Sequence, residues 1–279
     1  MNRILFEAEE ISRDDHLFLP AGDPRARHLR KVLKLDAGES FRAGIVNGVT
    51  AIASVLHRGE EGYELSLCRE TSAGPPLLPV TLLLGHPRPI VLKRMLKDLS
   101  TIGVGRILVF VSDRGEKSYL EANLWQTGEI RRALMEGAMQ AAATRIPEVH
   151  RRATLEEALA AALDGGKAAA PDGAVNTALD GGKAAAPDGS GSAGAPPRRI
   201  LADEAGPSDS VILSRLLESR RPVKPAEETV LAVGPERGWS DRERRLFLEA
   251  RFVSVTLGPR ILRTETAALY LCCTSAAEY

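Results

Sequence analysis

From residue 80 onward, apolar strand-like segments alternate with helical ones, and this alternation restricts the possible folds most strongly. Strands are predicted at residues 80–84, 106–111, 199–202, 229–233 and 252–256. Helices are predicted at 91–102, 127–143, 154–163, 208–219, 241–250 and 264–274. Strands that are apolar throughout are buried on both faces. The pattern therefore predicts an α/β fold whose parallel sheet is covered by helices on both sides.

The first 72 residues have a different pattern, with short strands separated by glycine and asparagine. Strands are predicted at residues 3–6, 40–46, 50–57 and 63–68. Asn47-Gly48 is a strong hairpin signal between two of them. We expect a small β-barrel over 1–73, a linker at Gly74-Pro75-Pro76, and a second domain over 78–279.

A duplicated segment interrupts the second domain. Residues 162–173, ALDGGKAAAPDG, recur unchanged at 178–189 and are followed by GSGSAGAPP. Each copy offers little apolar surface to bury, which argues against a solenoid repeat. We expect 164–197 to be a disordered insertion that carries no chemistry.

Composition excludes several classes of protein. Apolar residues make up 44% and charged residues 27% of the chain, as in soluble globular proteins. No apolar run reaches the roughly 18 residues that a membrane span needs. The acidic residues among the first twenty do not fit a secretory signal. We therefore expect a cytoplasmic protein without membrane association.

The cysteines and histidines predict neither a disulfide framework nor a metal site. Cys68, Cys272 and Cys273 are odd in number and include no CxxC pair, and the histidines are scattered. Cys272 and Cys273 are expected in the core of the last helix, and Trp125 and Trp239 are expected to serve packing. The sequence has no P-loop or GxSxG motif, and GVGRI at 103–107 lacks the GxGxxG spacing of a dinucleotide-binding loop.

Two predicted strands run directly into a Gly-Pro turn. These are LAVGPERG at 231–238 and VTLGPRILRTETA at 255–267. Ligands of open α/β sheets bind just beyond the carboxyl ends of the strands, where glycine permits close approach. Thr264 is expected to cap the last helix, with Glu265 in its first turn. From these residues alone, the two segments are as consistent with tight turns between well-capped helices and strands as with a ligand site.

A basic segment lies near the N-terminus, although the net charge of the whole chain is zero. Its basic residues are Arg25, Arg27, His28, Arg30, Lys31 and Lys34. Leu29, Val32 and Leu33 follow helical spacing, which would place the basic groups together on the outer face. Such a face suits contacts to nucleic-acid phosphates, and an ordinary solvated helix surface is the alternative.

The two Gly-Pro segments closely resemble the C-terminal signatures of the SPOUT superfamily of methyltransferases. Within it, LGPRILRTETA matches the family that methylates N3 of a uridine in 16S ribosomal RNA, the RsmE family. The family's first signature is usually GPEGG, and Arg237 replaces one of its glycines here. The likeness extends to LKRMLKDLSTIGV at 92–104, to residues 112–118, to 136–147, and to RHLRKVL in the basic segment.

The resemblance implies an S-adenosylmethionine-dependent enzyme that acts on 16S rRNA of the small ribosomal subunit. It implies a C-terminal trefoil knot, an N-terminal PUA-like RNA-binding barrel, and a homodimer. The cofactor-binding residues would be Leu84, Gly85, Val233, Gly234, Pro235, Glu236, Gly238, Leu257, Gly258, Ile261, Leu262, Arg263 and Thr266. RNA contacts would include the basic segment together with Lys93, Arg94, Arg114 and Arg145.

Methylation of uracil N3 requires loss of the N3 proton, so the site needs a base or an electrostatic stabiliser. Arg263 or Arg260 could stabilise negative charge on the uracil oxygens, and Glu236 or Glu265 could accept the proton. A structural role at the start of a helix is the alternative for both carboxylates, and it is the favoured one for Glu265.

Three other functions stay open at this point. A non-catalytic RNA-binding protein would keep the barrel and the basic segment but lack cofactor affinity. A SPOUT enzyme could act on another rRNA or tRNA position. A metabolic enzyme that binds a free nucleotide would leave residues 25–34 unexplained.

Overall fold

The computed structural model describes residues 2–164, 197–204, 211–212 and 228–276. The duplicated segment lies outside the described residues, and so does most of the helix predicted at 208–219. Two residues inside that predicted helix form strand β10 (Val211–Ile212), so the helix prediction is wrong there. By contacts the chain divides into two units. Unit 1 is Met1–Leu77 with Leu134–Ile146, and unit 2 is Leu78–Ala133 with Pro147–Tyr279.

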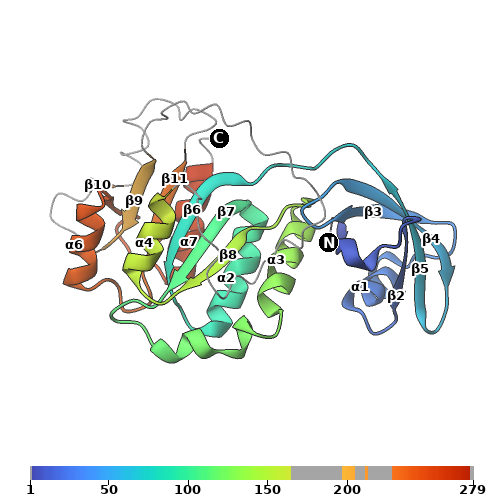
Figure 1. Cartoon of the computed structure of the whole chain (residues 1–279), viewed down its shortest axis with the longest axis horizontal. Helices are drawn as coiled ribbons and strands as arrows, with labels where there is room; N and C mark the ends of the chain where they lie inside the picture. The colour runs from blue at the N-terminus through green and yellow to red at the C-terminus, as the bar shows by residue number, and fades with distance from the viewer. Residues whose placement is uncertain (1, 165–196, 205–210, 213–227, 277–279) are drawn as a thin grey trace. The chain divides into compact units, whose positions relative to one another are not determined.

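Unit 1 contains a five-stranded sheet in the order β1-β3-β4-β5-β2 (Figure 1). Its strands are β1 (Ile4–Phe6), β2 (His16–Pro20), β3 (Ser40–Ile45), β4 (Thr50–Arg58) and β5 (Gly62–Arg69). All pairs are antiparallel except β1 with β3. Asn47 has a φ of +57°, as the predicted hairpin requires. β2 was not predicted, and no ladder between β1 and β2 closes these five strands into a barrel.

The basic segment folds as α1 (Pro24–His28) followed by a π-helical turn at Leu29–Leu33. Leu29 is fully buried against the sheet, as predicted. Val32 and Leu33 are 63% and 40% exposed, so their predicted inward orientation is wrong. The π-turn contributes to the difference at Val32, because hydrogen bonds that close over five residues rotate position i+3 away from the face of Leu29.

The segment 134–146 belongs to unit 1 through specific polar contacts, which the sequence did not indicate. Thr144 is fully buried, and its Oγ1 lies 2.8 Å from the Gly48 carbonyl oxygen and 2.7 Å from that of Ala73. The Ile146 amide donates to the side chain of Asn47 at 3.0 Å. Thus the hairpin tip of unit 1 is held by residues about a hundred positions further along the chain.

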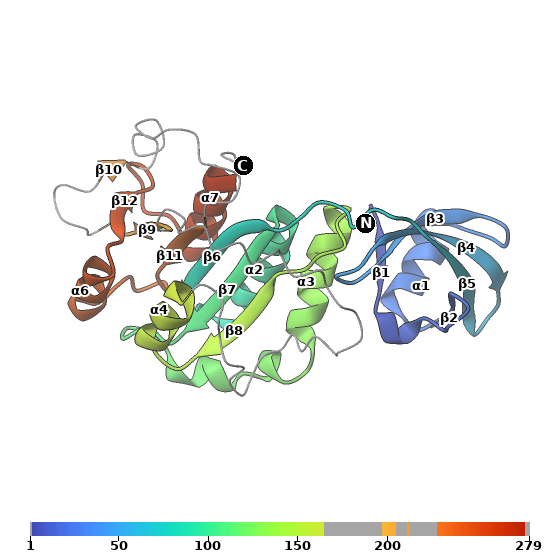
Figure 2. The same cartoon turned by 45° about the horizontal axis from the view of Figure 1, so that its top comes forward.

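Unit 2 contains a seven-stranded sheet in which every pair is parallel, which confirms the predicted α/β class. The order β10-β12-β9-β11-β6-β7-β8 can be followed across Figure 2. The further strands are β6 (Leu78–Gly85), β7 (Val104–Phe110), β8 (Glu148–Arg152), β9 (Arg198–Ala202), β11 (Thr229–Val233) and β12 (Val253–Thr256). β8 was not predicted because its sequence, EVHRR, is polar, as an edge strand permits.

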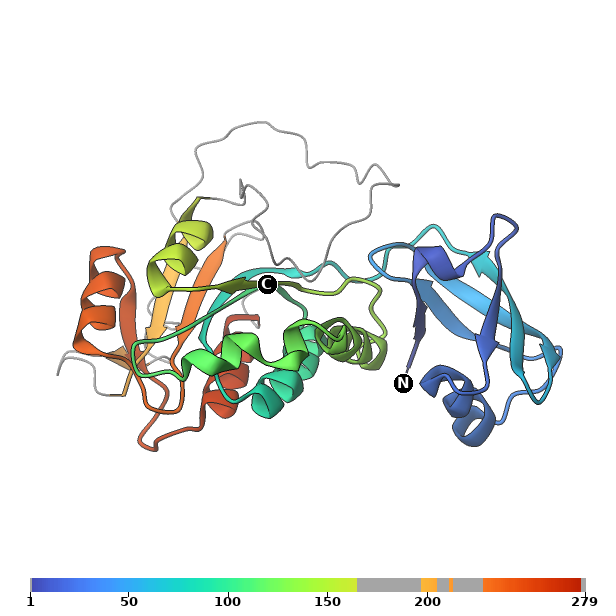
Figure 3. The same cartoon turned by 60° about the horizontal axis from the view of Figure 1, so that its bottom comes forward.

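Helices cover both faces of this sheet (Figure 3). On one face α2 (Pro89–Ile102) and α7 (Thr264–Ala276) pack against each other. On the other, α4 (Leu155–Leu163) and α6 (Asp241–Glu249) enclose a core with Phe110, Trp239 and Phe247. The other helices among the described residues are α3 (Glu129–Gln140) and three short 3-10 turns at Ala8–Glu10, Lys117–Glu121 and Asn123–Trp125.

The expected packing roles are mostly confirmed. Trp125 and Trp239 are buried, and so is Cys272, where burial raises the pKa of the thiol. Cys273 is exposed, so its predicted core position is wrong. None of the described helices is long and apolar enough to cross a membrane.

The end of β6 approaches the residues after β11 so closely that only glycine fits. A Cβ atom on Gly85 would lie 2.6 Å from Pro235 Cδ and 2.8 Å from its nitrogen. We predict that Gly85→Ala lowers the free energy of unfolding by about 1–3 kcal/mol, because the strand and the loop must move apart. Urea denaturation measures this. Gly22→Ala is the control, since a Cβ there meets nothing within 4 Å, and an equal loss in both variants would contradict the prediction.

Candidate functional site

A cavity of about 730 Å³ lies at the carboxyl edge of the parallel sheet in unit 2. We call it the main cavity. Its wall comes from the residues that follow β6, β7, β9, β11 and β12, so five strand ends meet around it. The lining residues are Arg88, Val91, Arg114, Ala202–Glu204, Val233–Trp239, Arg244, Leu257, Ile261–Glu265 and Ala267. Both Gly-Pro segments border this one cavity, as a ligand site would require.

The loop after β11 is fixed by a tight turn and by an aromatic ring beneath it. The Gly238 amide donates to the Pro235 carbonyl at 2.9 Å, and Gly238 has a φ of +64°, which favours glycine. Trp239 lies under Gly234, where a Cβ would be only 3.2 Å from the indole. The indole nitrogen donates to the Ala202 carbonyl at 2.9 Å, so the loop after β11 is tied to the end of β9.

The start of α7 is tied to the same loop. The Thr264 hydroxyl donates to the Gly234 carbonyl at 3.1 Å, and Thr264 is buried. The predicted role of Thr264 as N-cap is therefore wrong: it is the first helical residue, and its hydroxyl joins the two Gly-Pro segments. Arg263 occupies the preceding position, where its carbonyl accepts from the Ala267 amide at 2.8 Å.

A third loop, which follows β9, also lines the main cavity, and the sequence analysis did not predict it. Asp203 is buried and pairs with Arg244 of α6 at 2.7 Å, and this contact raises the pKa of Arg244. The Glu204 carboxylate accepts from the Leu262 amide at 3.0 Å. Their position in the sequence could have predicted this role, because both acids directly follow a predicted buried strand, as ligand-site residues do in such sheets.

The predicted cofactor residues fall into two groups. Those that line the cavity are Val233, Gly234, Pro235, Glu236, Gly238, Leu257, Ile261, Leu262 and Arg263. Leu84 and Gly85 lie behind Pro235 at the buried end of β6, while Gly258 and Thr266 are outside the lining. The two Gly-Pro strands are not neighbours, because β9 lies between β11 and β12.

The three proposed catalytic residues all border the main cavity. Arg263 is exposed there, and Glu265 is half-buried in the first turn of α7. Glu236 is exposed, and its carboxylate accepts from the Arg88 amide at 3.3 Å. At the position where the family signature has glycine, the carbonyl of Arg237 accepts from the Arg114 guanidinium at 3.2 Å.

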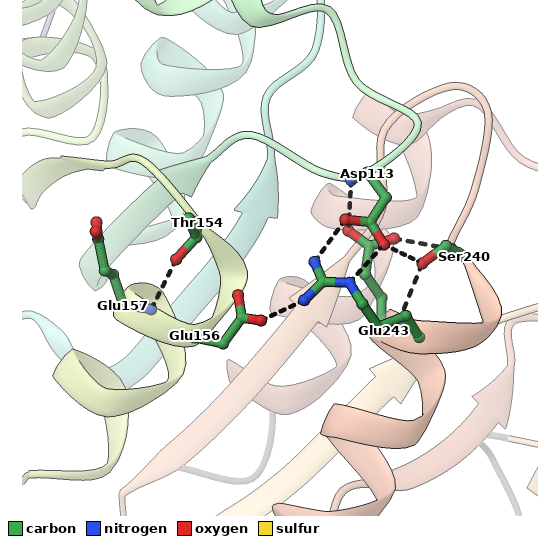
Figure 4. Close-up of polar contacts among 7 residues, drawn as sticks. Asp113, Thr154, Glu156, Glu157, Ser240 and Glu243 are labelled. Carbon is green, nitrogen blue, oxygen red and sulfur yellow. Dashed lines mark hydrogen bonds and ion pairs between the residues drawn. The ribbon is translucent and has the colours of Figure 1, made fainter.

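An ion-pair network anchors the loop after β7, which carries Arg114 (Figure 4). Asp113 binds Arg242 at 2.5 Å and the Ser240 hydroxyl at 2.5 Å, and the Arg242 contact lowers the pKa of Asp113. Arg242 also pairs with Glu156 at the start of α4. Glu243, fully buried, accepts from the Asp113 amide at 2.9 Å and from the Ser240 amide at 2.8 Å.

The basic segment of unit 1 separates into structural and exposed side chains. Arg25 is held by Glu10 at 2.5 Å and Asp23 at 2.7 Å, which raises its pKa, so it does not share the outer face as predicted. Arg30 donates to the Gly59 carbonyl at 2.7 Å and lies over the Tyr63 ring. The His28 side chain is half-buried, and burial lowers its pKa. The side chains that remain exposed are Arg27, Lys31 and Lys34.

The other predicted RNA contacts are all exposed. Lys93 and Arg94 lie on α2, where Lys93 pairs with Glu129 at 2.6 Å. Arg114 borders the main cavity, and Arg145 lies in the segment that belongs to unit 1. Among the described residues, no group of histidine, cysteine, aspartate and glutamate has the arrangement of a metal site.

The fold and the cavity together define an α/β protein with a ligand-sized cavity at the carboxyl edge of a parallel sheet. A family described as the RNA methyltransferase domain matches residues 74–184 and 197–276. The chain is 30% identical to the ribosomal RNA small subunit methyltransferase E of Treponema pallidum, over 98% of this chain and 89% of that one. This chain therefore belongs to the RNA methyltransferase family, and within it to the ribosomal RNA small subunit methyltransferase E group.

Other relatives agree with this assignment. A Borreliella burgdorferi protein named ribosomal RNA small subunit methyltransferase E 1 is 25% identical over 88% of this chain and 87% of its own length. The fold matches that of the Neisseria gonorrhoeae ribosomal RNA small subunit methyltransferase E, solved with S-adenosyl methionine, at a TM-score of 0.68 and 21% identity. That match covers 100% of this chain and 98% of the other.

We predict that Glu243→Ala lowers the free energy of unfolding by about 1–3 kcal/mol, because it leaves two backbone amides without their acceptor. Urea denaturation followed by circular dichroism measures the loss. Glu249→Ala is the matched control, since Glu249 is exposed at the end of the same helix. Unchanged stability of the Glu243 variant would mean that water replaces the carboxylate without cost.

Proposed function

We propose that this protein transfers a methyl group from S-adenosylmethionine to N3 of a uridine in 16S ribosomal RNA of the small ribosomal subunit. Membership of the family supports the reaction class, and the names of the relatives support the RNA. The observation that carries the proposal is the main cavity, in which both Gly-Pro segments face one ligand-sized space.

The residues of the main cavity fit S-adenosylmethionine. Its volume of about 730 Å³ lies within the usual range for small-molecule sites, about 300–1,000 Å³. Val233, Leu257 and Ile261 supply apolar surface for a purine ring, and the glycine-containing loops bring backbone groups close to it. Glu204 supplies a carboxylate that suits a cationic sulfonium or ribose hydroxyls. The cavity-lining members of the predicted set are accordingly our proposed cofactor residues.

When bound, the cofactor supplies a methyl group already activated by a positively charged sulfur. The protein therefore has to orient the acceptor, remove its N3 proton and stabilise the resulting charge. Arg263 can donate to the uracil oxygens as negative charge develops. Glu236 or Glu265 can take the N3 proton, since both carboxylates border the main cavity.

We further propose that unit 1 is the PUA-like RNA-binding domain, essentially residues 1–73, and that the methyltransferase domain covers 78–279. The exposed Arg27, Lys31 and Lys34 support phosphate contacts. The trefoil knot is part of the proposal on the resemblance to the family alone. On the basis of the resemblance to the family, we also propose that the protein is a cytoplasmic homodimer.

We expect Thr264→Val to weaken S-adenosylmethionine binding about tenfold, because the Gly234 carbonyl loses its donor and the two Gly-Pro segments separate. Isothermal titration calorimetry gives the affinity. Thr264→Ser keeps the hydroxyl and serves as control, with an affinity near that of the wild type. If the valine variant bound S-adenosylmethionine as tightly as the wild type, this hydrogen bond would make no contribution to cofactor binding.

Arg263→Ala is expected to reduce methyl transfer about 10²- to 10³-fold while the fold survives, because the charge on the uracil oxygens loses its donor. Transfer of tritiated methyl groups to unmodified small-subunit rRNA measures the rate. Arg245→Ala, on the exposed side of α6, is the charge-matched control. Full activity of the Arg263 variant would exclude Arg263 from the mechanism.

A further inference from the structure

A second, smaller cavity opens beside the main cavity in unit 2. Its volume is about 90 Å³, and we call it the side cavity. The two cavities share the residues Arg88, Arg114, Pro235, Glu236 and Arg237. The remaining lining of the side cavity is His86, Gly115, Glu116 and Tyr119. A group that occupied the side cavity would therefore lie directly against whatever fills the main cavity.

The buried wall of the side cavity is formed by His86 and is uncharged. His86 is 1% exposed, and both of its ring nitrogens are engaged. Its Nδ1 lies 2.6 Å from the Pro87 carbonyl, and Trp125 Nε1 donates to its Nε2 at 3.1 Å. These partners fix the neutral tautomer with the proton on Nδ1. Burial lowers the pKa of the ring, which also favours the neutral form. The Tyr119 ring lies 5.7 Å from the imidazole, centroid to centroid.

The rim of the side cavity carries donors and acceptors of opposite charge. Arg88 and Arg114 supply guanidinium groups, while Glu116 and Glu236 supply carboxylates. A uracil ring presents two carbonyl oxygens on either side of an N3–H donor, so guanidinium donors and a carboxylate acceptor match its edge. Cytosine presents an amino group and a bare N3 instead, and a guanidinium has nothing to donate to at that amino group.

The loop that carries these groups is held in place before any ligand arrives. The amide of Asp113, next to Arg114, donates to the buried Glu243, and the Asp113 carboxylate is fixed by Arg242 and Ser240. The Gly115 amide donates to the Ser112 carbonyl at 2.8 Å, and the Tyr119 amide to that of Glu116 at 3.2 Å. Preorganisation of this kind is what a site for a small planar ring requires.

We propose that the side cavity receives the uracil ring of the target nucleotide, turned out of the RNA, with Tyr119 stacking on the ring and Glu116 accepting from a ribose hydroxyl of the same nucleotide. This inference rests on the proposed function and adds the acceptor site to it. Enzymes that modify bases commonly extrude the base, stack it on aromatic side chains and bind its Watson–Crick edge. The shared wall then sets uracil N3 toward the main cavity, with Glu236 between the two.

Tyr119 and Glu116 are the residues to test, because neither lines the main cavity. We expect Tyr119→Ala to lower kcat/KM for small-subunit rRNA roughly 5- to 150-fold, the range that corresponds to one lost base-stacking contact. Its affinity for S-adenosylmethionine, measured by calorimetry, should equal that of the wild type. Tyr119→Phe keeps the ring and should stay near wild-type activity, and Glu121→Ala, on the exposed side of the same turn, is the control.

Glu116→Gln provides a second variant in which folding is not at risk, because Glu116 is exposed. It should lower kcat/KM for the RNA while cofactor affinity is retained. Wild-type kcat/KM in both Tyr119→Ala and Glu116→Gln would overturn the proposal. Reduced cofactor affinity in either variant would also overturn it, since the residue would then belong to the cofactor site.

A crosslinking experiment gives a readout independent of turnover. Small-subunit rRNA transcribed with 5-bromouridine is irradiated with the full-length protein, and the crosslinked peptides are identified by mass spectrometry. A crosslink at Tyr119 is expected, and it should disappear in Tyr119→Ala. Crosslinks confined to unit 1 would overturn the proposal.

Measurements on the wild-type protein distinguish a failure of the proposed function from a failure of the side-cavity assignment. If it neither binds S-adenosylmethionine nor methylates the rRNA, the proposed function itself fails. If it does both, any one of the contrary results named above overturns the side-cavity assignment alone.

Discussion

One hydrogen bond, from the Thr264 hydroxyl to the Gly234 carbonyl, joins the two loops on which the site depends. Each loop follows a different strand, and β9 separates those strands in the sheet. Short polar contacts tie the ends of these loops together. The Glu204 contact to the Leu262 amide and the Trp239 contact to the Ala202 carbonyl extend this cross-linking to the loop after β9. The main cavity is the space that these contacts leave open.

Much of the sheet was predictable because its strands are buried on both faces and therefore read as apolar runs. β8, with the sequence EVHRR, escaped because an edge strand need not be apolar. The order of the strands could not be predicted, since periodicity contains no information about which strand lies beside which. The two strands that end in Gly-Pro turns, β11 and β12, are separated by β9, and nothing in their sequences indicates this.

The site was predictable in part, and the limits have physical causes. The Gly-Pro motifs correctly indicated most of the cavity lining, because they follow apolar strands directly. The inward orientation expected for Val32 and Leu33 was wrong, and at Val32 a π-turn that alters the helical period locally contributes to the difference. Arg25 was expected on the surface with the other basic residues, but its guanidinium is paired with the carboxylates of Glu10 and Asp23. Charge counted along a sequence does not distinguish a paired group from a free one.

The place of β11 has a consequence for how the chain can be assembled. β6 and β9 both precede β11 in the sequence, yet they do not pair with each other, because β11 occupies the slot between them. A nascent chain that has emerged only as far as β9 holds two unsatisfied strand edges facing an empty slot. Such edges invite pairing with other chains. During synthesis these two edges are therefore open to incorrect pairing until residues 229–233 enter the sheet between them.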